Sequence, residues 1–287
     1  MNRILVIGGT GNIGRQVVGR LTATRAQVRA LVRNPEGAHL PSQVEVMRGD
    51  LTSPDTLDAC LDGIDTVFLV WTAPRTAVAP AIERIAKRTR RIVLLSAPLK
   101  TPHPFFQQPN SSRDLAEEVE RTIEASGREW TFLRSGMFAL NAWHFWGPQI
   151  RAGDVVRWPY LAVPTAPIDE RDIAAVAVRA LTGDRHAGME YVLTGPESVS
   201  QYEQISTIGS VMGRSLRIEE LSADEARSVG LAGMPPSVTD RLLDAWGAAI
   251  GRPAFVTSVV EEITGTPART FREWVTVNAA AFRAPLQ

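Results

Sequence analysis

Residues 3–14 read Arg-Ile-Leu-Val-Ile-Gly-Gly-Thr-Gly-Asn-Ile-Gly, and this stretch decides the fold. Its apolar run, 3–7, stops at a glycine, as expected for a strand buried in a parallel sheet. The glycines follow the spacing Gly8-x-x-Gly11-x-x-Gly14 and lead into an amphipathic helix expected from Asn12 to about Ala23. Small residues at such a turn let backbone amides approach a dinucleotide pyrophosphate. The alternative is a glycine turn kept only for packing. The residues expected at the cofactor are Gly8, Thr10, Gly11, Asn12, Ile13, Gly14 and Arg15.

The rest of the chain repeats the strand-then-helix order. Further strands are expected at 28–32, 44–46, 66–70, 91–95 and 130–134, with helices between most of them. This alternation predicts an α/β fold with a doubly wound parallel sheet. The last third, whose short helical segments are separated by Gly and Pro, predicts a small α-rich C-terminal lobe. We expect a nucleotide-binding domain over 1–155 and a smaller substrate lobe over 156–287, with some elements returning to the sheet.

The residues after the second strand select between the two nicotinamide cofactors. Arg33 follows that strand and no carboxylate appears until Glu36, whereas an acidic residue there would bind the 2′-hydroxyl of NAD(H). With Arg15, the guanidinium of Arg33 suits a 2′-phosphate, so NADP(H) is favoured and NAD(H) is less favoured. The alternative is that both arginines are solvated surface charges. Weaker cofactor candidates follow the third and fourth strands, at Asp50, Leu51, Thr72 and Ala73.

Composition excludes several other classes of function. The chain has 31 basic and 31 acidic residues and a pI near 6.9, which argues against a broad nucleic-acid or anionic-membrane surface. The single cysteine, Cys60, can form no internal disulfide and no cysteine metal cluster, so no metal is expected. No apolar run reaches the length of a transmembrane helix and no signal peptide is evident, so we expect a cytoplasmic protein. The oligomeric state is left open between a monomer and a homodimer.

Several motifs together carry a family resemblance. They are the glycine turn, Arg33-Asn34-Pro35, Gly49-Asp50-Leu51, Ala125-Ser126-Gly127, Trp130-Thr131-Phe132-Leu133-Arg134 and Tyr191-Val192-Leu193-Thr194-Gly195-Pro196. Over about residues 1–215 the chain resembles the NmrA-like group of atypical short-chain dehydrogenases/reductases. The resemblance implies a Rossmann domain with a small substrate lobe, usually NADPH, and members that include quinone and azo-dye reductases as well as cofactor-sensing regulators.

The catalytic pair typical of the superfamily is missing. No tyrosine stands four residues before a lysine, and the chain has only two lysines, Lys87 and Lys100. Lys100 follows the fifth strand and is the only lysine expected near a substrate. Ser96, where the resemblance places a substrate-orienting serine that would also contact the cofactor, and His103 are the other candidates for the catalytic site. The alternative for Ser96 is a small residue at the end of a strand, and the alternative for His103 is a histidine in a surface loop.

An aromatic segment after the sixth strand is the expected substrate wall. Ligands of open α/β sheets bind beyond the carboxyl ends of the strands, and a flat, apolar molecule would suit such side chains. The alternative is that these aromatics form the core between the two lobes. The predicted substrate-binding residues are Met137, Phe138, Asn141, Trp143, His144, Trp146 and Trp158.

Three functions remain open on this basis. The first is an NADPH-dependent reductase of a quinone-like or aromatic carbonyl compound. Such an acceptor can take its proton from water, so the missing catalytic acid does not exclude it. The second is a regulator that binds NADP(H) without turnover, and the third is an isomerase or cyclase on the same fold.

Overall fold

A seven-stranded parallel sheet forms the centre of the protein in the computed structural model, which describes residues 2–283. The strand order β3-β2-β1-β4-β5-β6-β9 is that of a doubly wound sheet, which confirms the predicted Rossmann fold. The strands are β1 (Arg3–Ile7), β2 (Gln27–Val32), β3 (Glu45–Arg48), β4 (Thr66–Val70), β5 (Arg91–Ser96), β6 (Glu129–Ser135) and β9 (Met189–Leu193). Side chains of each central strand alternate between two hydrophobic cores, one on each face.

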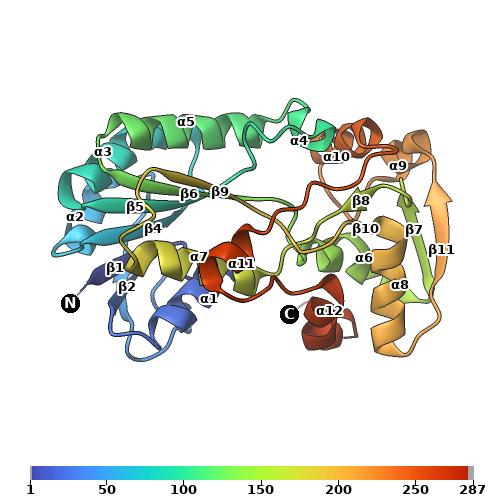
Figure 1. Cartoon of the computed structure of the whole chain (residues 1–287), viewed down its shortest axis with the longest axis horizontal. Coiled ribbons are helices and arrows are strands. Elements are labelled where there is room, and N and C mark those ends of the chain that lie inside the picture. Colours follow the sequence, from blue (N-terminus) through green and yellow to red (C-terminus); the bar gives the residue numbers. More distant parts are fainter. Residues whose placement is uncertain (1, 284–287) are drawn as a thin grey trace.

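Helices cover both faces, as Figure 1 shows with α3 and α5 on one side of the sheet and α1 and α7 on the other. The helices of this part are α1 (Asn12–Leu21), α2 (Leu57–Leu61), α3 (Val78–Arg88), α5 (Ser111–Ala125), α7 (Glu170–Thr182) and α11 (Val259–Thr264), with short 3-10 turns η1 (Pro54–Thr56) and η2 (Arg75–Ala77). Because the strands are parallel, the loops that follow them all leave at one edge, where the predicted site residues stand.

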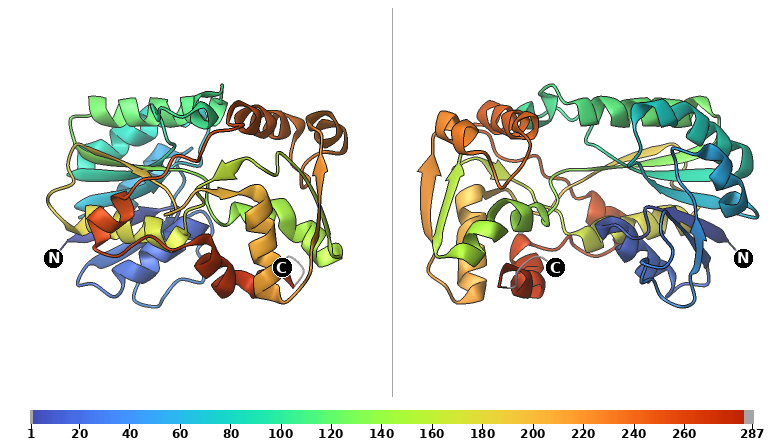
Figure 2. Two further views of the ribbon diagram at one scale, coloured as in Figure 1. Left: turned by 45° about the vertical axis from the view of Figure 1, so that its right-hand side comes forward. Right: turned by 180° about the vertical axis from the view of Figure 1, so that it is seen from behind.

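A second lobe lies beyond this edge (Figure 2). Its helices are α4 (Pro104–Gln107), α6 (Asn141–Ala152), α8 (Gln201–Met212), α9 (Ala223–Val229), α10 (Pro236–Ala248) and α12 (Phe271–Asn278), followed by η3 (Ala279–Phe282). Two small sheets complete it, formed by β7 (Val155–Pro159) with β11 (Arg217–Leu221) and by β8 (Pro164–Thr165) with β10 (Val199–Ser200). The lobe is therefore rich in helices but also holds strands that the sequence did not predict.

The chain crosses between the lobes several times. It returns to the sheet through α7 and β9, enters the lobe again at β10, and comes back through residues 252–258 to α11, which packs on α7. Helix α6, within the predicted first domain, belongs to the core of the second lobe. The division at residue 155 stays a prediction, and residues 1 and 284–287 of the two predicted domains lie outside the described part.

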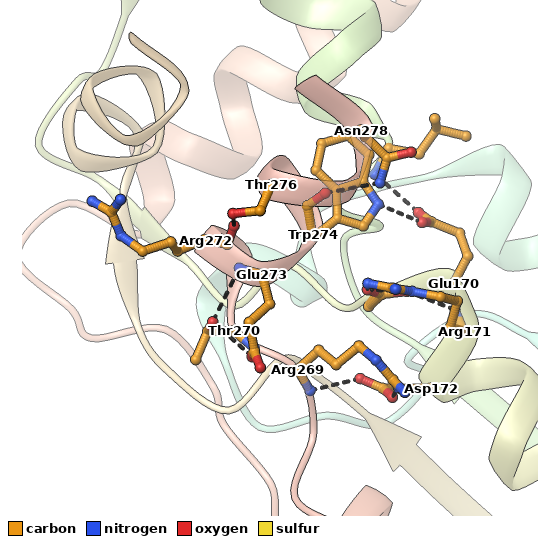
Figure 3. A network of polar contacts seen from close by, with 12 residues as sticks. Glu170, Arg171, Asp172, Arg269, Thr270, Arg272, Glu273, Trp274, Thr276 and Asn278 are labelled. Atoms are coloured by element: carbon orange, nitrogen blue, oxygen red, sulfur yellow. Dashed lines mark hydrogen bonds and ion pairs between the residues drawn. The ribbon is translucent and has the colours of Figure 1, made fainter. Parts of the chain in front are cut away.

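A polar network joins α7 of the sheet domain to α12 of the second lobe (Figure 3). The carboxylate of Glu170 accepts hydrogen bonds from the backbone amide of Leu140 at 2.9 Å and from the indole of Trp274 at 2.8 Å. Asp172 pairs with Arg269 and accepts its backbone amide at 2.7 Å. These carboxylates are buried, so the contacts fix α12 against α7 and thereby the position of the second lobe.

We expect Glu170→Gln to change how stability depends on pH. Burial raises the pKa of Glu170 above its ordinary value near 4.5, although the bonds from Leu140 and Trp274 oppose that rise. The folded state therefore holds this proton to higher pH than the unfolded state, and stability falls as pH rises through that interval. Urea unfolding should show the variant gaining about 1 kcal/mol relative to the parent between about pH 5 and about pH 8.

Glu273→Gln is the matched control for this measurement. Hydrogen bonds from Thr270 lower the pKa of Glu273, so its contribution is lost only at acidic pH and should stay constant over the same range. A difference between Glu170→Gln and the parent that does not change with pH would contradict the assignment of the buried proton.

Candidate functional site

The glycine turn between β1 and α1 is packed too closely for larger residues. Gly8 has a φ of +89°, in the region that favours glycine, and its carbonyl accepts the amide of Gly11 at 3.0 Å. A Cβ added to Gly14 would lie 2.0 Å from the carbonyl oxygen of Gly8. The turn therefore requires glycine at both positions, and the start of α1 is held directly against the end of β1.

The amino end of α1 is open for an anion. Gly11 is its N-cap, and among the described residues no side chain caps the helix and no acidic residue stands in its first turn. Thr10, Gly11 and Asn12 are exposed, whereas Ile13 is buried and anchors the helix. Uncapped amides at the positive end of a helix, beside backbone without side chains, fit a pyrophosphate.

The two arginines predicted to bind a 2′-phosphate differ in their surroundings. Arg33 is exposed just past β2 and forms no hydrogen bond or ion pair with another described residue. Hydrogen bonds from Thr52 are the main reason why the pKa of Asp50 is lowered, and the charge of Arg33 adds to this effect. Arg15 is partly engaged, because its Nε donates to the carbonyl of Thr10 at 2.8 Å. Arg33 is thus the guanidinium available to a ligand, and Arg15 also supports the turn.

The weaker cofactor candidates lie along the same edge. Asp50 is half-buried and accepts the amide and hydroxyl of Thr52, whereas the side chain of Leu51 belongs to the core of the sheet. Thr72 is exposed and Ala73 is buried, and the carbonyl of Ala73 accepts the indole of Trp71 at 2.7 Å. Only the backbone of Leu51 and Ala73 is therefore suited to border a cofactor.

Two of the three predicted catalytic residues are engaged by other groups. The hydroxyl of Ser96 donates to buried Glu120 at 2.6 Å, and Glu120 is paired with Arg134 at 2.6 Å. His103 caps α4, where Nδ1 accepts the amide of Phe105 at 3.3 Å and Nε2 lies 2.9 Å from the carbonyl oxygen of Pro253. Lys100 is exposed in the loop with a φ of +58°.

Arg134, at the end of β6, belongs to a buried ion-pair group. It binds Glu120 with two nitrogens and Glu190 with a third at 2.5 Å, and only 3% of its side chain is exposed. The group formed by Ser96, Glu120 and Arg134 therefore holds β5 and α5 to β6 behind the site.

Two adjoining hollows form a cleft at the carboxyl ends of β5, β6 and β9, against the second lobe. Their cavity volumes are about 20 Å³ and 220 Å³, and they share the walls Phe105, Phe106, Gly136 and Met137. The smaller one reaches Thr194 after β9, and the larger one extends from Ala97 and Pro98 after β5 to α10. We name the whole the inter-lobe cleft; its other lining residues are His103, Gln108, Asn110, Arg113, Ser135, Pro164, Thr165, Ala166, Arg241, Leu242, Ala245, Ala254 and Phe255.

Sequence reasoning missed Phe105 and Phe106. Both lie on α4, a short helix in the proline-containing segment between β5 and α5. The signal was present as two adjacent phenylalanines after Pro104, in a stretch otherwise polar enough to be a surface loop. An aromatic pair in such a loop indicates that the loop folds back over apolar surface.

The predicted aromatic wall needs correction. Trp146 and Trp158 are at most 1% exposed and pack with Phe145 and Trp246 in the core of the second lobe, so they cannot face an open cleft. Of the remaining predicted substrate-binding residues, only Met137 lines the cleft. Phe138 packs against the sheet core, Asn141 contacts the sulfur of Met137, Trp143 donates to the carbonyl of Ala281, and His144 is exposed.

Comparison with known proteins agrees with this geometry. Residues 8–184 match a family model described as NAD(P)H-binding. The "(4-alkanoyl-5-oxo-2,5-dihydrofuran-3-yl)methyl phosphate reductase" of Streptomyces griseus is 41% identical, covering 97% of this chain and 99% of that protein. The "NAD(P)H azoreductase" of Xenophilus azovorans is 33% identical, covering 98% and 99%.

Solved structures share the fold. An NADPH-dependent quinone oxidoreductase from Escherichia coli has a TM-score of 0.78 at 24% identity, covering 96% of this chain and 99% of that chain. Triphenylmethane reductase of Citrobacter, solved with NADP(H), has a TM-score of 0.80 at 18% identity with the same coverage. Over residues 2–283, no helix is long and apolar enough to cross a membrane.

Proposed function

The chain belongs to the NAD(P)H-binding, NmrA-like family of atypical short-chain dehydrogenases/reductases, and from that premise we propose its reaction. It is an oxidoreductase that acts on a small molecule. We propose that it uses NADPH to reduce a quinone-like or aromatic carbonyl compound by direct hydride transfer. The nicotinamide, when bound, supplies the hydride.

The inter-lobe cleft carries this proposal. It opens at the ends of β5 and β6, the part of an open sheet where ligands bind, and its shared walls are Phe105, Phe106 and Met137. Flat aromatic and sulfur-containing walls suit a planar, conjugated molecule because they offer large contact area without polar groups. Gly136, which also belongs to the shared wall, has no side chain and therefore leaves space for a substrate.

The proton-donating side chains that line the cleft favour one kind of acceptor. Reduction of a simple ketone needs an acid that protonates the developing alkoxide. Among the described residues, no tyrosine, lysine or carboxylate lines the cleft, and both ring nitrogens of His103 are engaged. A conjugated acceptor delocalises the added electron pair and can take its proton from water, so the residues present are sufficient for it.

The two curated relatives support the same class of acceptor. The name of the Streptomyces griseus reductase describes a dihydrofuran ring whose double bond is conjugated with carbonyl groups, and that of the second relative refers to an azo group. Both acceptors are unsaturated and conjugated, as a quinone is. The proposal extends this shared feature to the present chain.

A panel assay tests the proposed reaction. The purified protein is mixed with NADPH and with 2-methyl-1,4-naphthoquinone, an aromatic aldehyde or cyclohexanone, and the loss of reduced nicotinamide absorbance is followed. We expect the fastest turnover with the quinone, whose added electron pair is delocalised, and none with cyclohexanone. Tight NADPH binding without turnover of any acceptor would refute the proposal and favour a cofactor-sensing regulator.

We expect Gly136→Leu to lower kcat/KM for the quinone about tenfold while leaving NADPH affinity unchanged. A Cβ at Gly136 would meet its neighbours no closer than 3.5 Å, so the fold accepts it, but a leucine side chain would occupy the shared wall of the cleft. Gly136→Ala is the control and should keep most of the activity. Unchanged steady-state kinetics of Gly136→Leu would place the substrate elsewhere.

A further inference from the structure

The lining of the larger hollow of the inter-lobe cleft carries positive charge. Its lining contains two arginines, Arg113 from α5 and Arg241 from α10, and no carboxylate among the described residues. The protein as a whole has no net charge, so this imbalance is local. The rest of that wall is mostly apolar, with Phe105, Phe106 and Leu242 among its residues, and its polar members Gln108, Asn110 and Ser135 carry no charge.

Arg241 has no partner in the part of the chain described. Two aspartates flank it on α10, at positions 240 and 244, but both turn to Arg227 of α9, at 3.3 Å and 3.7 Å. Arg241 itself is half-buried and forms no hydrogen bond or ion pair with a described residue. The acids that could have neutralised it are therefore committed to a different arginine.

Arg113 is anchored, and most of its donors remain available. One terminal nitrogen donates to the carbonyl of Phe106, which holds the guanidinium at the wall of the cleft. A guanidinium has five N–H donors, and the other described contacts of Arg113 involve only its backbone. Arg113 stands in the first turn of the 15-residue helix α5, where Asn110 caps the helix and Asp114 is also present, so the guanidinium itself is the available cation.

Two half-buried cations beside aromatic walls are costly unless an anion compensates them. We propose that Arg113 and Arg241 form a subsite for an anionic substituent, a phosphate or carboxylate, carried by the substrate. This inference rests on the proposed function, because it places the conjugated part of the substrate at the strand ends near Ala97 and the anion toward α10. Planar guanidinium groups suit both anions through paired hydrogen bonds.

Binding of inert ligands tests the subsite without requiring turnover. The complex with NADP⁺ is titrated with 1-naphthyl phosphate, 1-naphthoate and the neutral 1-naphthalenemethanol in a calorimeter. The parent should bind at least one anion about tenfold more tightly than the alcohol, and the two anionic arms distinguish phosphate from carboxylate. Arg241→Gln and Arg113→Gln should each remove that preference while the affinity for the alcohol stays the same.

Arg121→Gln is the matched control, because Arg121 lies on α5 outside the cleft and should keep the preference. Equal binding of anions and alcohol by the parent, or an undiminished preference in both cleft variants, would overturn the inference. The outcome is separate from the proposed reaction: preferential anion binding by a protein that oxidises no NADPH would keep the subsite and reject the reductase.

Discussion

Gly14→Ala is expected to weaken NADPH binding at least about 100-fold and to destabilise the fold by about 3 kcal/mol. The new methyl carbon would lie 2.0 Å from the carbonyl oxygen of Gly8 and 2.9 Å from Cα of Gly9. Both neighbours are backbone, so no side chain can move aside. The start of α1 must shift away from the end of β1, and the uncapped amides then no longer converge on one point.

Calorimetric titration with NADPH and a thermal melt measure the two effects. Gly19→Ala is the matched control, because it lies on the same helix and its added methyl group would meet nothing within 4 Å. That control should keep cofactor affinity and gain roughly 0.5–1 kcal/mol of stability. If Gly14→Ala binds NADPH as the parent does, the turn does not hold the pyrophosphate.

Arg33→Ala is expected to raise the Kd for NADPH about 100-fold and to leave the Kd for NADH nearly unchanged. The side chain has no partner among the described residues, so its loss should not disturb the fold. Its guanidinium group can donate paired hydrogen bonds to a 2′-phosphate, a group that NADH lacks. The ratio of the two affinities therefore isolates this one interaction.

Arg25→Ala provides the comparison for charge alone, since Arg25 precedes β2 and lies at the opposite edge of the sheet. It should alter neither affinity. Equal weakening of NADPH and NADH by Arg33→Ala would mean that this arginine serves the cofactor without recognising the phosphate, and the preference for NADPH would then lose its support.

The sequence predicted the sheet and the cofactor edge because both depend on local patterns. The apolar run before Gly8 and the spacing of three glycines are contained within twelve residues, and parallel strands bring every following loop to one edge. The fold and the NAD(P)H-binding family are confirmed. The individual cofactor residues stay proposals that the variants above test.

The substrate side could not be predicted in the same way, because it depends on contacts between distant segments. Trp146 and Phe106 are both aromatic residues near the strand ends, yet Trp146 is buried in the core of the second lobe and Phe106 lines the cleft. The path of residues 201–283 decides which of these aromatic residues is buried and which lines the cleft. Likewise, the partner of Ser96 lies 24 positions away, and that of His103 lies 150 positions away.

A single-turnover experiment tests the central claim, that the cleft beside the cofactor edge reduces conjugated acceptors. The complexes of the parent and of Gly136→Leu with NADPH are each mixed rapidly with 2-methyl-1,4-naphthoquinone. The parent should oxidise its bound NADPH in one phase whose rate rises with quinone concentration and saturates, whereas the variant should oxidise it about tenfold more slowly at the same subsaturating quinone concentration. Equal oxidation by both proteins, or none by the parent, would contradict the claim.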